Sequence, residues 1–142
     1  MPGLVHAAHQ GRIALANQLG AGALETTALL AFLAPLAREV LGEELALPSV
    51  ATWWCGQASA RDYVLEHLDE LVIKPTYREA TAPGPRHGPA LDAAARRILA
   101  DQIRANPRDF CGQELVRLGT TPAWIDGQLQ PAPFVLRLFV TE

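Results

Sequence analysis

The sequence has few of the residues that mark several common classes of protein. It contains only two cysteines, Cys55 and Cys111, in 142 residues. Two cysteines are too few for the disulfide framework of a small secreted domain, and these two lack the close spacing of metal ligands. We therefore expect reduced thiols in the core of a cytoplasmic protein.

Long apolar runs and an excess of basic charge are also absent. The most apolar region, residues 28–41, is interrupted by Pro35, Arg38 and Glu39, and it is too short to span a bilayer. The N-terminus lacks the basic start and the apolar run of a signal peptide. A formal net charge of -3 argues against a polyanionic partner, because nucleic-acid binding usually needs a basic face. These features predict a soluble chain that binds neither membranes nor nucleic acids.

The chain nevertheless has enough apolar material for a core, since 49% of its residues are hydrophobic. Three stretches have apolar residues at helical spacing, and Pro35 is expected to kink or split the first. Ser59 and Asp62 form a weak capping box for the second, and Asn106-Pro107 stops the third. The predicted helices are Thr26–Leu41, Ser59–Glu70 and a helix that Pro89 opens.

Apolar runs with β-branched residues predict strands, and the continuous run Leu71-Val72-Ile73 is typical of a strand covered on both faces. Asp126-Gly127, flanked by Ile125 and Leu129, predicts a two-residue hairpin turn. The order of elements favours an α+β layered fold with a mixed or antiparallel sheet, a C-terminal β-hairpin and packed helices. The other strand candidates are Arg12–Ala16, Phe110–Arg117, Thr120–Ile125 and Phe134–Thr141.

Lys74 is the only lysine, whereas the other eleven basic side chains are arginines. It lies at the end of a predicted strand, and ligands of α/β sheets gather beyond the carboxyl ends of strands. Its compact ammonium acts as a point charge toward phosphate, unlike the planar guanidinium of arginine. Lys74 is therefore a candidate phosphate ligand, and an ordinary surface lysine is the alternative interpretation.

A loop rich in Pro and Gly follows this strand at residues 79–89. Gly84 and Gly88 can offer backbone N–H groups to a phosphate that no side chain obstructs. The loop matches neither the P-loop pattern nor the glycine pattern of a Rossmann turn. A plain surface loop is the alternative interpretation.

Two later segments add polar candidates. Gln113 and Glu114 end a predicted strand and could offer carboxamide and backbone groups to an adenine edge, although a solvated strand end is commoner. Arg137 shares a predicted strand face with Val135 and Phe139, so its charge should have an anionic partner, either phosphate or a carboxylate. The constellation is more specific than any of its members, which are Lys74, Gly88, Gln113, Glu114 and Arg137.

Several segments resemble the type 2 group of circularly permuted ATP-grasp proteins, which are relatives of glutathionylspermidine synthetase-like ligases. The resemblance covers nearly the whole chain, and LPSVATWWCG is its most specific part. The segments that carry it are ANQLGAGALE (Ala16–Glu25), LGEELALPSVATWWCGQ (Leu41–Gln57), RDYVLEHLDELVIKP (Arg61–Pro75), FCGQELV (Phe110–Val116) and PFVLRLFV (Pro133–Val140).

The resemblance implies an ATP-grasp fold, in which two α+β subdomains hold ATP and activate a carboxylate as an acylphosphate for attack by an amine. It implies ATP and Mg²⁺ as cofactors and a carboxylate and an amine as substrates. By analogy, Lys74 contacts the phosphates and the loop around Gly88 covers them. Gln113 and Glu114 then form the adenine-side hinge, while Arg137 faces the phosphates.

The acidic segment with which the family would bind Mg²⁺ is not found in this chain, and no other cluster clearly replaces it. We therefore expect residues 1–142 to form a single partial ATP-grasp-like domain, with the loop at 79–89 between its halves. We assign it no metal ligand and no catalytic residue, and we expect it to be inactive alone. Its partners would be nucleotide and either a missing ligase segment or a second copy.

Two other classes of function compete with this hypothesis. The chain could be a non-catalytic module that binds nucleotide or another protein. It could also have no ligand, in which case Trp53, Trp54 and the strand at 134–140 only pack a core or an interface.

Overall fold

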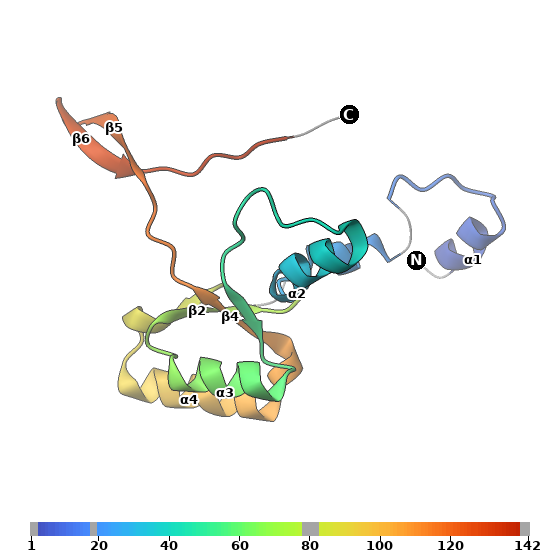
Figure 1. Cartoon of the computed structure of the whole chain (residues 1–142), viewed down its shortest axis with the longest axis horizontal. Helices are drawn as coiled ribbons and strands as arrows, with labels where there is room; N and C mark the ends of the chain where they lie inside the picture. Colours follow the sequence, from blue (N-terminus) through green and yellow to red (C-terminus); the bar gives the residue numbers. More distant parts are fainter. Residues whose placement is uncertain (1–2, 18–19, 78–82, 140–142) are drawn as a thin grey trace.

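The body of the protein is a four-stranded antiparallel sheet, seen in a computed structural model that describes residues 3–17, 20–77 and 83–139 (Figure 1). The strand order is β1-β4-β2-β3, so β4 and β2 are the two central strands. The predicted strand at Leu71–Ile73 is confirmed, because its three residues are buried at the start of β2. The strands are β1 (Thr52–Trp54), β2 (Leu71–Pro75), β3 (Arg86–His87) and β4 (Phe110–Glu114).

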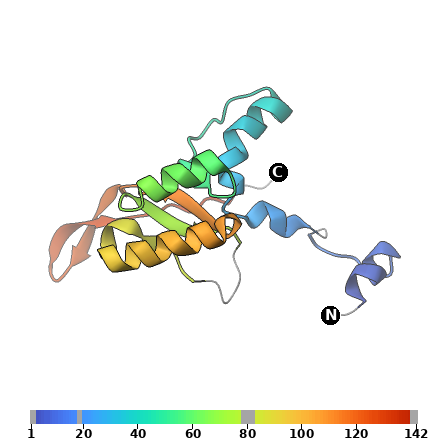
Figure 2. The ribbon, with the colours of Figure 1, turned by 90° about the horizontal axis from the view of Figure 1, so that it is seen from below.

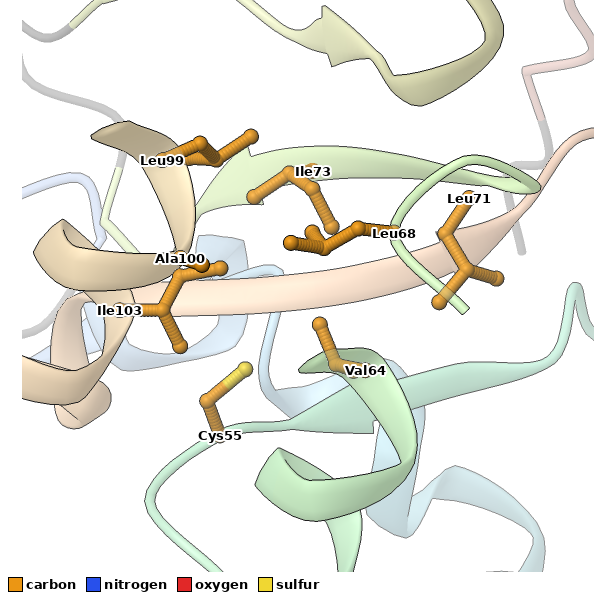
Figure 3. Close-up of a cluster of buried hydrophobic side chains, with 8 residues drawn as sticks. All are labelled: Cys55, Val64, Leu68, Leu71, Ile73, Leu99, Ala100 and Ile103. Carbon is orange, nitrogen blue, oxygen red and sulfur yellow. The ribbon is translucent and has the colours of Figure 1, made fainter. Parts of the chain in front are cut away.

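Two helices, α3 (Ala58–Glu66) and α4 (Ala93–Ala105), cover one face of this sheet (Figures 1 and 2). Asp92 caps α4, since its carboxylate accepts a 2.7 Å hydrogen bond from the Ala95 N–H. The side chains of both helices meet those of β2 in one cluster (Figure 3). Its members are Cys55, Val64, Leu68, Leu71, Ile73, Leu99, Ala100 and Ile103.

This cluster is the main source of stability in the sheet and its helices. Ile73, Leu99 and Ile103 are at most 1% exposed, and full burial of each such side chain contributes about 1.5–3 kcal/mol. Gly112 lets α3 approach closely, because a Cβ there would lie 2.5 Å from a methyl group of Val64. The sheet and the two helices therefore pack as one unit.

A third helix, α2 (Leu29–Leu36), packs on the sheet near Trp54. The ring of Phe32 meets the Trp54 ring edge-on at 6.2 Å, and the Trp54 Nε1 donates to the Arg108 carbonyl at 3.0 Å. Pro35 lies inside α2, and a π-helical turn, η2 (Ala37–Leu41), continues the helical backbone after Leu36; the predicted kink or split at Pro35 stays a prediction. The Thr27 N–H donates to the Thr76 carbonyl at 2.9 Å and joins this region to the end of β2.

The remaining elements are short. The helix α1 (Leu4–His9) buries none of its residues. Within the described residues, we find no helix long and apolar enough to cross a membrane. The 3₁₀ turns are η1 (Ala21–Glu25), η3 (Gly88–Ala90) and η4 (Pro107–Asp109).

A β-hairpin projects from the body and is formed by β5 (Thr120–Ile125) and β6 (Gln128–Pro133) (Figure 1). The predicted turn at Asp126-Gly127 is confirmed. Its two residues have φ values of 52° and 77°, as the left-handed turns that suit the strand twist require. One face of the hairpin is apolar, and Trp124 on this face is 72% exposed.

Several predicted element boundaries were wrong. Residues 12–16 form bends and irregular backbone rather than a strand, and residues 134–139 run outside both sheets. The last two residues of the predicted strand at 134–141 lie outside the described part of the chain. Pro89 is the second residue of the 3₁₀ turn η3, and α4 begins only after the Asp92 cap. The helix predicted from Ser59 has Gln57 as its N-cap and no side-chain cap, so the capping box does not form.

Three prolines protect the open edges of the hairpin. The Phe134 N–H donates to the Gly119 carbonyl at 3.1 Å, so this pair and every second pair toward the turn are hydrogen-bonded. Pro122, Pro131 and Pro133 occupy the intervening pairs, whose backbone nitrogens point outward. Because proline has no N–H, these edges offer few donors to another strand.

We expect that replacement of both Pro131 and Pro133 by threonine will increase self-association of the purified chain. The two changes restore outward N–H groups at the edge of β6. Sedimentation velocity over a roughly hundredfold range of protein concentration would measure the self-association. Ala132→Thr is the matched control, because its N–H faces β5; equal association of the two variants would contradict the prediction.

The two cysteine thiols are buried, and burial raises the pKa of Cys55 to about 12. Burial also raises the pKa of Cys111, while a hydrogen bond with Thr76 lowers it by less. Because the fold favours the neutral thiol, each raised pKa makes the free energy of unfolding depend on pH. Its contribution is complete below the unfolded pKa of about 8.5, and it is lost as pH rises through the folded pKa. Both thiols are therefore protonated and unreactive in the folded protein at neutral pH.

We expect iodoacetamide at pH 8 to alkylate both cysteines roughly a hundredfold more slowly in the folded chain than in urea, because only the thiolate reacts. Mass spectrometry of the alkylated peptides would measure both rates. Rapid alkylation of Cys55 or Cys111 without urea would show that the thiols are accessible and would contradict the burial.

Candidate functional site

The alternation of β2 places Lys74 on the face of the sheet opposite the helical cluster. Ile73 points toward α4, so its neighbours Val72 and Lys74 point to the other face. The register pairs Val72 with Gln113, and Gln113 in turn with Thr52 on β1. Three polar side chains from three adjacent strands therefore share one face.

These side chains form a connected chain of hydrogen bonds. The Lys74 Nζ donates to the Gln113 Oε1. The Gln113 Nε2 donates to the Thr52 Oγ1 at 3.0 Å, and this hydroxyl donates to the Val50 carbonyl at 2.9 Å. Gln113 is buried and Lys74 half-buried, so the ammonium is the end of the chain that faces solvent.

A pocket of about 540 Å³ opens beside Lys74. Its volume lies within the range of roughly 300–1,000 Å³ that is usual for small-molecule sites. Lys74 and Glu25 are the two charged residues in its described wall. The lining residues are Leu24, Glu25, Thr26, Thr27, Leu30, Lys74, Pro75, Pro83, Gly84 and Pro85.

Among the described residues, no carboxylate forms an ion pair with Lys74. In the part of the chain that the structure describes, the four ion pairs all involve arginines and lie elsewhere. Gln113, the hydrogen-bond acceptor of Lys74, is a neutral amide. The ammonium is therefore held in place while its charge stays free to attract an anion.

The structure explains Gly88 by packing rather than by ligand contact. A Cβ at this position would lie 1.7 Å from the Leu68 carbonyl oxygen and 2.7 Å from that of Leu71. Gly88 follows β3 at the Leu71 end of β2, whereas Gly84 lines the pocket beside Lys74. Of the described loop residues, Pro83, Gly84 and Pro85 line the pocket, whereas residues 79–82 of the predicted loop lie outside the described part of the chain. The proposed role of Gly88 in covering phosphates stays a prediction.

Glu114 and Arg137 are not gathered at the pocket. Glu114 pairs with Leu71, so its exposed side chain lies on the face opposite that of Gln113. Its N–H donates to the Ala51 carbonyl at 2.9 Å. Arg137 is exposed on the segment that follows the hairpin and is not part of the pocket wall. Their proposed roles beside ATP remain predictions.

Thr52 is a site residue that sequence reasoning missed. It lies in the segment LPSVATWWCG, but nothing in its local pattern indicated a strand beside β4. The described residues also contain no group of three or more His, Cys, Asp or Glu that could hold a metal ion. The described part of the site therefore combines the Lys74 ammonium, a buried amide and a hydroxyl.

The whole chain, residues 1–142, matches the family described as circularly permuted ATP-grasp type 2. The chain therefore belongs to this family, as its sequence resemblance predicted. Its α+β architecture of antiparallel sheets, packed helices and a C-terminal hairpin agrees with that fold class.

Three relatives with similar sequences are much longer than this chain. It is 35% identical over 140 residues to an uncharacterized protein of Synechocystis sp., a match that covers 99% of this chain and 29% of the relative. It is 36% identical over 137 residues to a Frankia casuarinae protein named "Putative glutamate--cysteine ligase 2-2", a match that covers 96% of this chain and 16% of the relative. It is 37% identical over 137 residues to an uncharacterized protein of Mycobacterium tuberculosis, a match that covers 96% of this chain and 15% of the relative. The chain thus spans less than a third of each of these relatives.

We expect Gly88→Ala to destabilise the fold by roughly 1–3 kcal/mol or more, because the added methyl group must displace backbone at Leu68. Urea denaturation followed by circular dichroism would measure the change. Gly84→Ala is the control in the same loop, since nothing lies within 4 Å of the added methyl group. Equal unfolding midpoints for the two variants would contradict this account of Gly88.

Proposed function

We propose that this chain forms part of the nucleotide-binding site of an ATP-dependent ligase that joins a carboxylate to an amine. One observation carries the proposal: the Lys74 ammonium is half-buried, donates to a neutral amide and makes no ion pair with any described residue, and it lies beside a pocket of ligand size. Membership of the ATP-grasp family supports ATP as the anion that this site binds. The Frankia relative's name supports the ligase class.

The described residues fit the phosphate part of a nucleotide. Lys74 would hold a phosphate oxygen by a charge-assisted hydrogen bond, and the half-buried setting strengthens this attraction over that of an exposed charge. When bound, ATP supplies the phosphoryl group that activates a carboxylate. Pro83, Gly84 and Pro85 would limit the access of water from the loop side of the pocket.

The described residues do not fit a divalent cation in the same way, because they bring no group of three candidate ligands together. We therefore assign no step to Mg²⁺ in this chain. Glu25 is one carboxylate in the pocket wall, and its negative charge opposes an anion near it. Glu25 thus favours a pose in which phosphate lies toward Lys74, on the β2 side of the pocket.

We expect Lys74→Ala to weaken binding of ATP by roughly tenfold to a hundredfold. The change removes one charge-assisted hydrogen bond, worth roughly 1.5–3 kcal/mol. Lys74→Arg should restore only part of the affinity, because the larger planar head cannot occupy the same point. Isothermal titration calorimetry on the three proteins would measure the affinities.

Arg97→Ala is the matched control, since it removes an exposed positive charge from α4 on the other face of the sheet. It should change the affinity little. Equal ATP affinity for wild type and Lys74→Ala, with circular dichroism unchanged, would remove Lys74 from the site and leave the proposal without its main support.

A further inference from the structure

The hydrogen bonds that join Lys74 to Thr52 have a fixed direction. An ammonium can only donate a hydrogen bond, and the Val50 carbonyl can only accept one. The hydroxyl proton of Thr52 is used on that carbonyl at 2.9 Å, so its oxygen is left to accept from Gln113. The two ends of the chain therefore determine the orientation of the amide between them.

The orientation of the Gln113 amide matters because its two ends differ. Its Nε2 faces Thr52, and its Oε1 accepts from Lys74. If the amide were rotated by half a turn, two donor groups would face each other at Lys74. Gln113 is only 6% exposed, so water cannot readily take over the bond that Thr52 makes.

We propose that Thr52 is a positioning residue for the anion site, and that it acts through Gln113 to hold the Lys74 ammonium toward the pocket. Thr52 does not contact Lys74 and lines no part of the pocket wall. The positioning of Lys74 follows from its hydrogen bond to Gln113 and from that of Gln113 to Thr52. Only its consequence for nucleotide binding rests on the proposed function.

The proposal makes Gln113 a support for Lys74 in addition to any contact with adenine. A neutral amide suits this role better than a carboxylate. Glu at position 113 would bind the ammonium more strongly, but it would also neutralise the charge that attracts a phosphate. The buried amide orients the cation and leaves its charge available.

The test uses the fact that Lys74 is the only lysine of the chain. Its acetylation by a limiting amount of acetic anhydride can be followed by mass spectrometry of one peptide, apart from the N-terminal amine. Thr52→Val removes the hydroxyl at nearly constant volume. We expect it to speed acetylation of Lys74 about fivefold, the factor that corresponds to the loss of one hydrogen bond of about 1 kcal/mol.

Thr52→Ser keeps the hydroxyl and should restore the wild-type rate, which a loss of packing alone would not do. Thr76→Val is the control for a buried hydroxyl, since Thr76 donates to the Arg108 carbonyl and not to Gln113. It should leave the rate for Lys74 near that of wild type. Equal rates in wild type and Thr52→Val, with both proteins folded by circular dichroism, would overturn the proposal.

A measurement on the wild-type chain covers the case in which Thr52→Val does not fold. The single lysine ammonium signal in a nitrogen-detected NMR spectrum should show hydrogen exchange several-fold slower than that of free lysine. Exchange at the free rate would overturn the proposal as well.

A second series with ATP separates the two proposals. If Thr52→Val speeds acetylation but ATP protects Lys74 in no variant, the positioning role stands and the proposed nucleotide site fails. If ATP protects Lys74 in wild type and the acetylation rates without ATP are equal in all variants, the nucleotide site stands and the positioning role fails. If both hold, Thr52→Val should weaken ATP binding about fivefold and Thr52→Ser should not.

Discussion

The register between β2 and β4 is the constraint on which the rest of the structure depends. It places Ile73 opposite Gly112 under α3 and α4, and Lys74 and Gln113 on the other face. A shift by one residue would reverse every side chain of β2, which would take Ile73 out of the apolar cluster and direct an ammonium into it. Burial of Ile73 in the apolar cluster therefore selects the correct register, and this register in turn keeps Lys74 beside the pocket.

The parts of the fold that the sequence predicted are those with a strong local signal. The apolar run at Leu71–Ile73, the Asp126-Gly127 turn and the stop at Asn106-Pro107 each fix their structure through nearby residues. The short strands β1 and β3 have no such signal, because they exist only through pairing with β4 and β2. Residues 134–139 show the converse, since a pattern suited to a strand has no partner strand beside it.

The candidate site was predictable only in part for a related reason. Lys74 stood out by its residue type and its place after a strand, and the structure joins it to Gln113. Thr52 could not be found in this way, because its contact with Gln113 spans 61 positions and requires the order β1-β4-β2. Gly88 has a packing requirement that composition could not indicate, because the Leu68 carbonyl oxygen leaves no room for a side chain at this position.

The geometry around Gln113 favours lysine over arginine at position 74. An ammonium at position 74 places its charge at one point and still has donors left for an anion after bonding to the Gln113 oxygen. A guanidinium would bring five N–H groups in a rigid plane to a half-buried position beside Pro75, where one amide oxygen cannot satisfy them. Unpaired donors there would cost free energy or draw the head group out into solvent. Arg38 and Arg104, by contrast, are exposed, so water and a carboxylate can surround each guanidinium. The residue type at position 74 is thus set by the single neutral acceptor that the sheet provides.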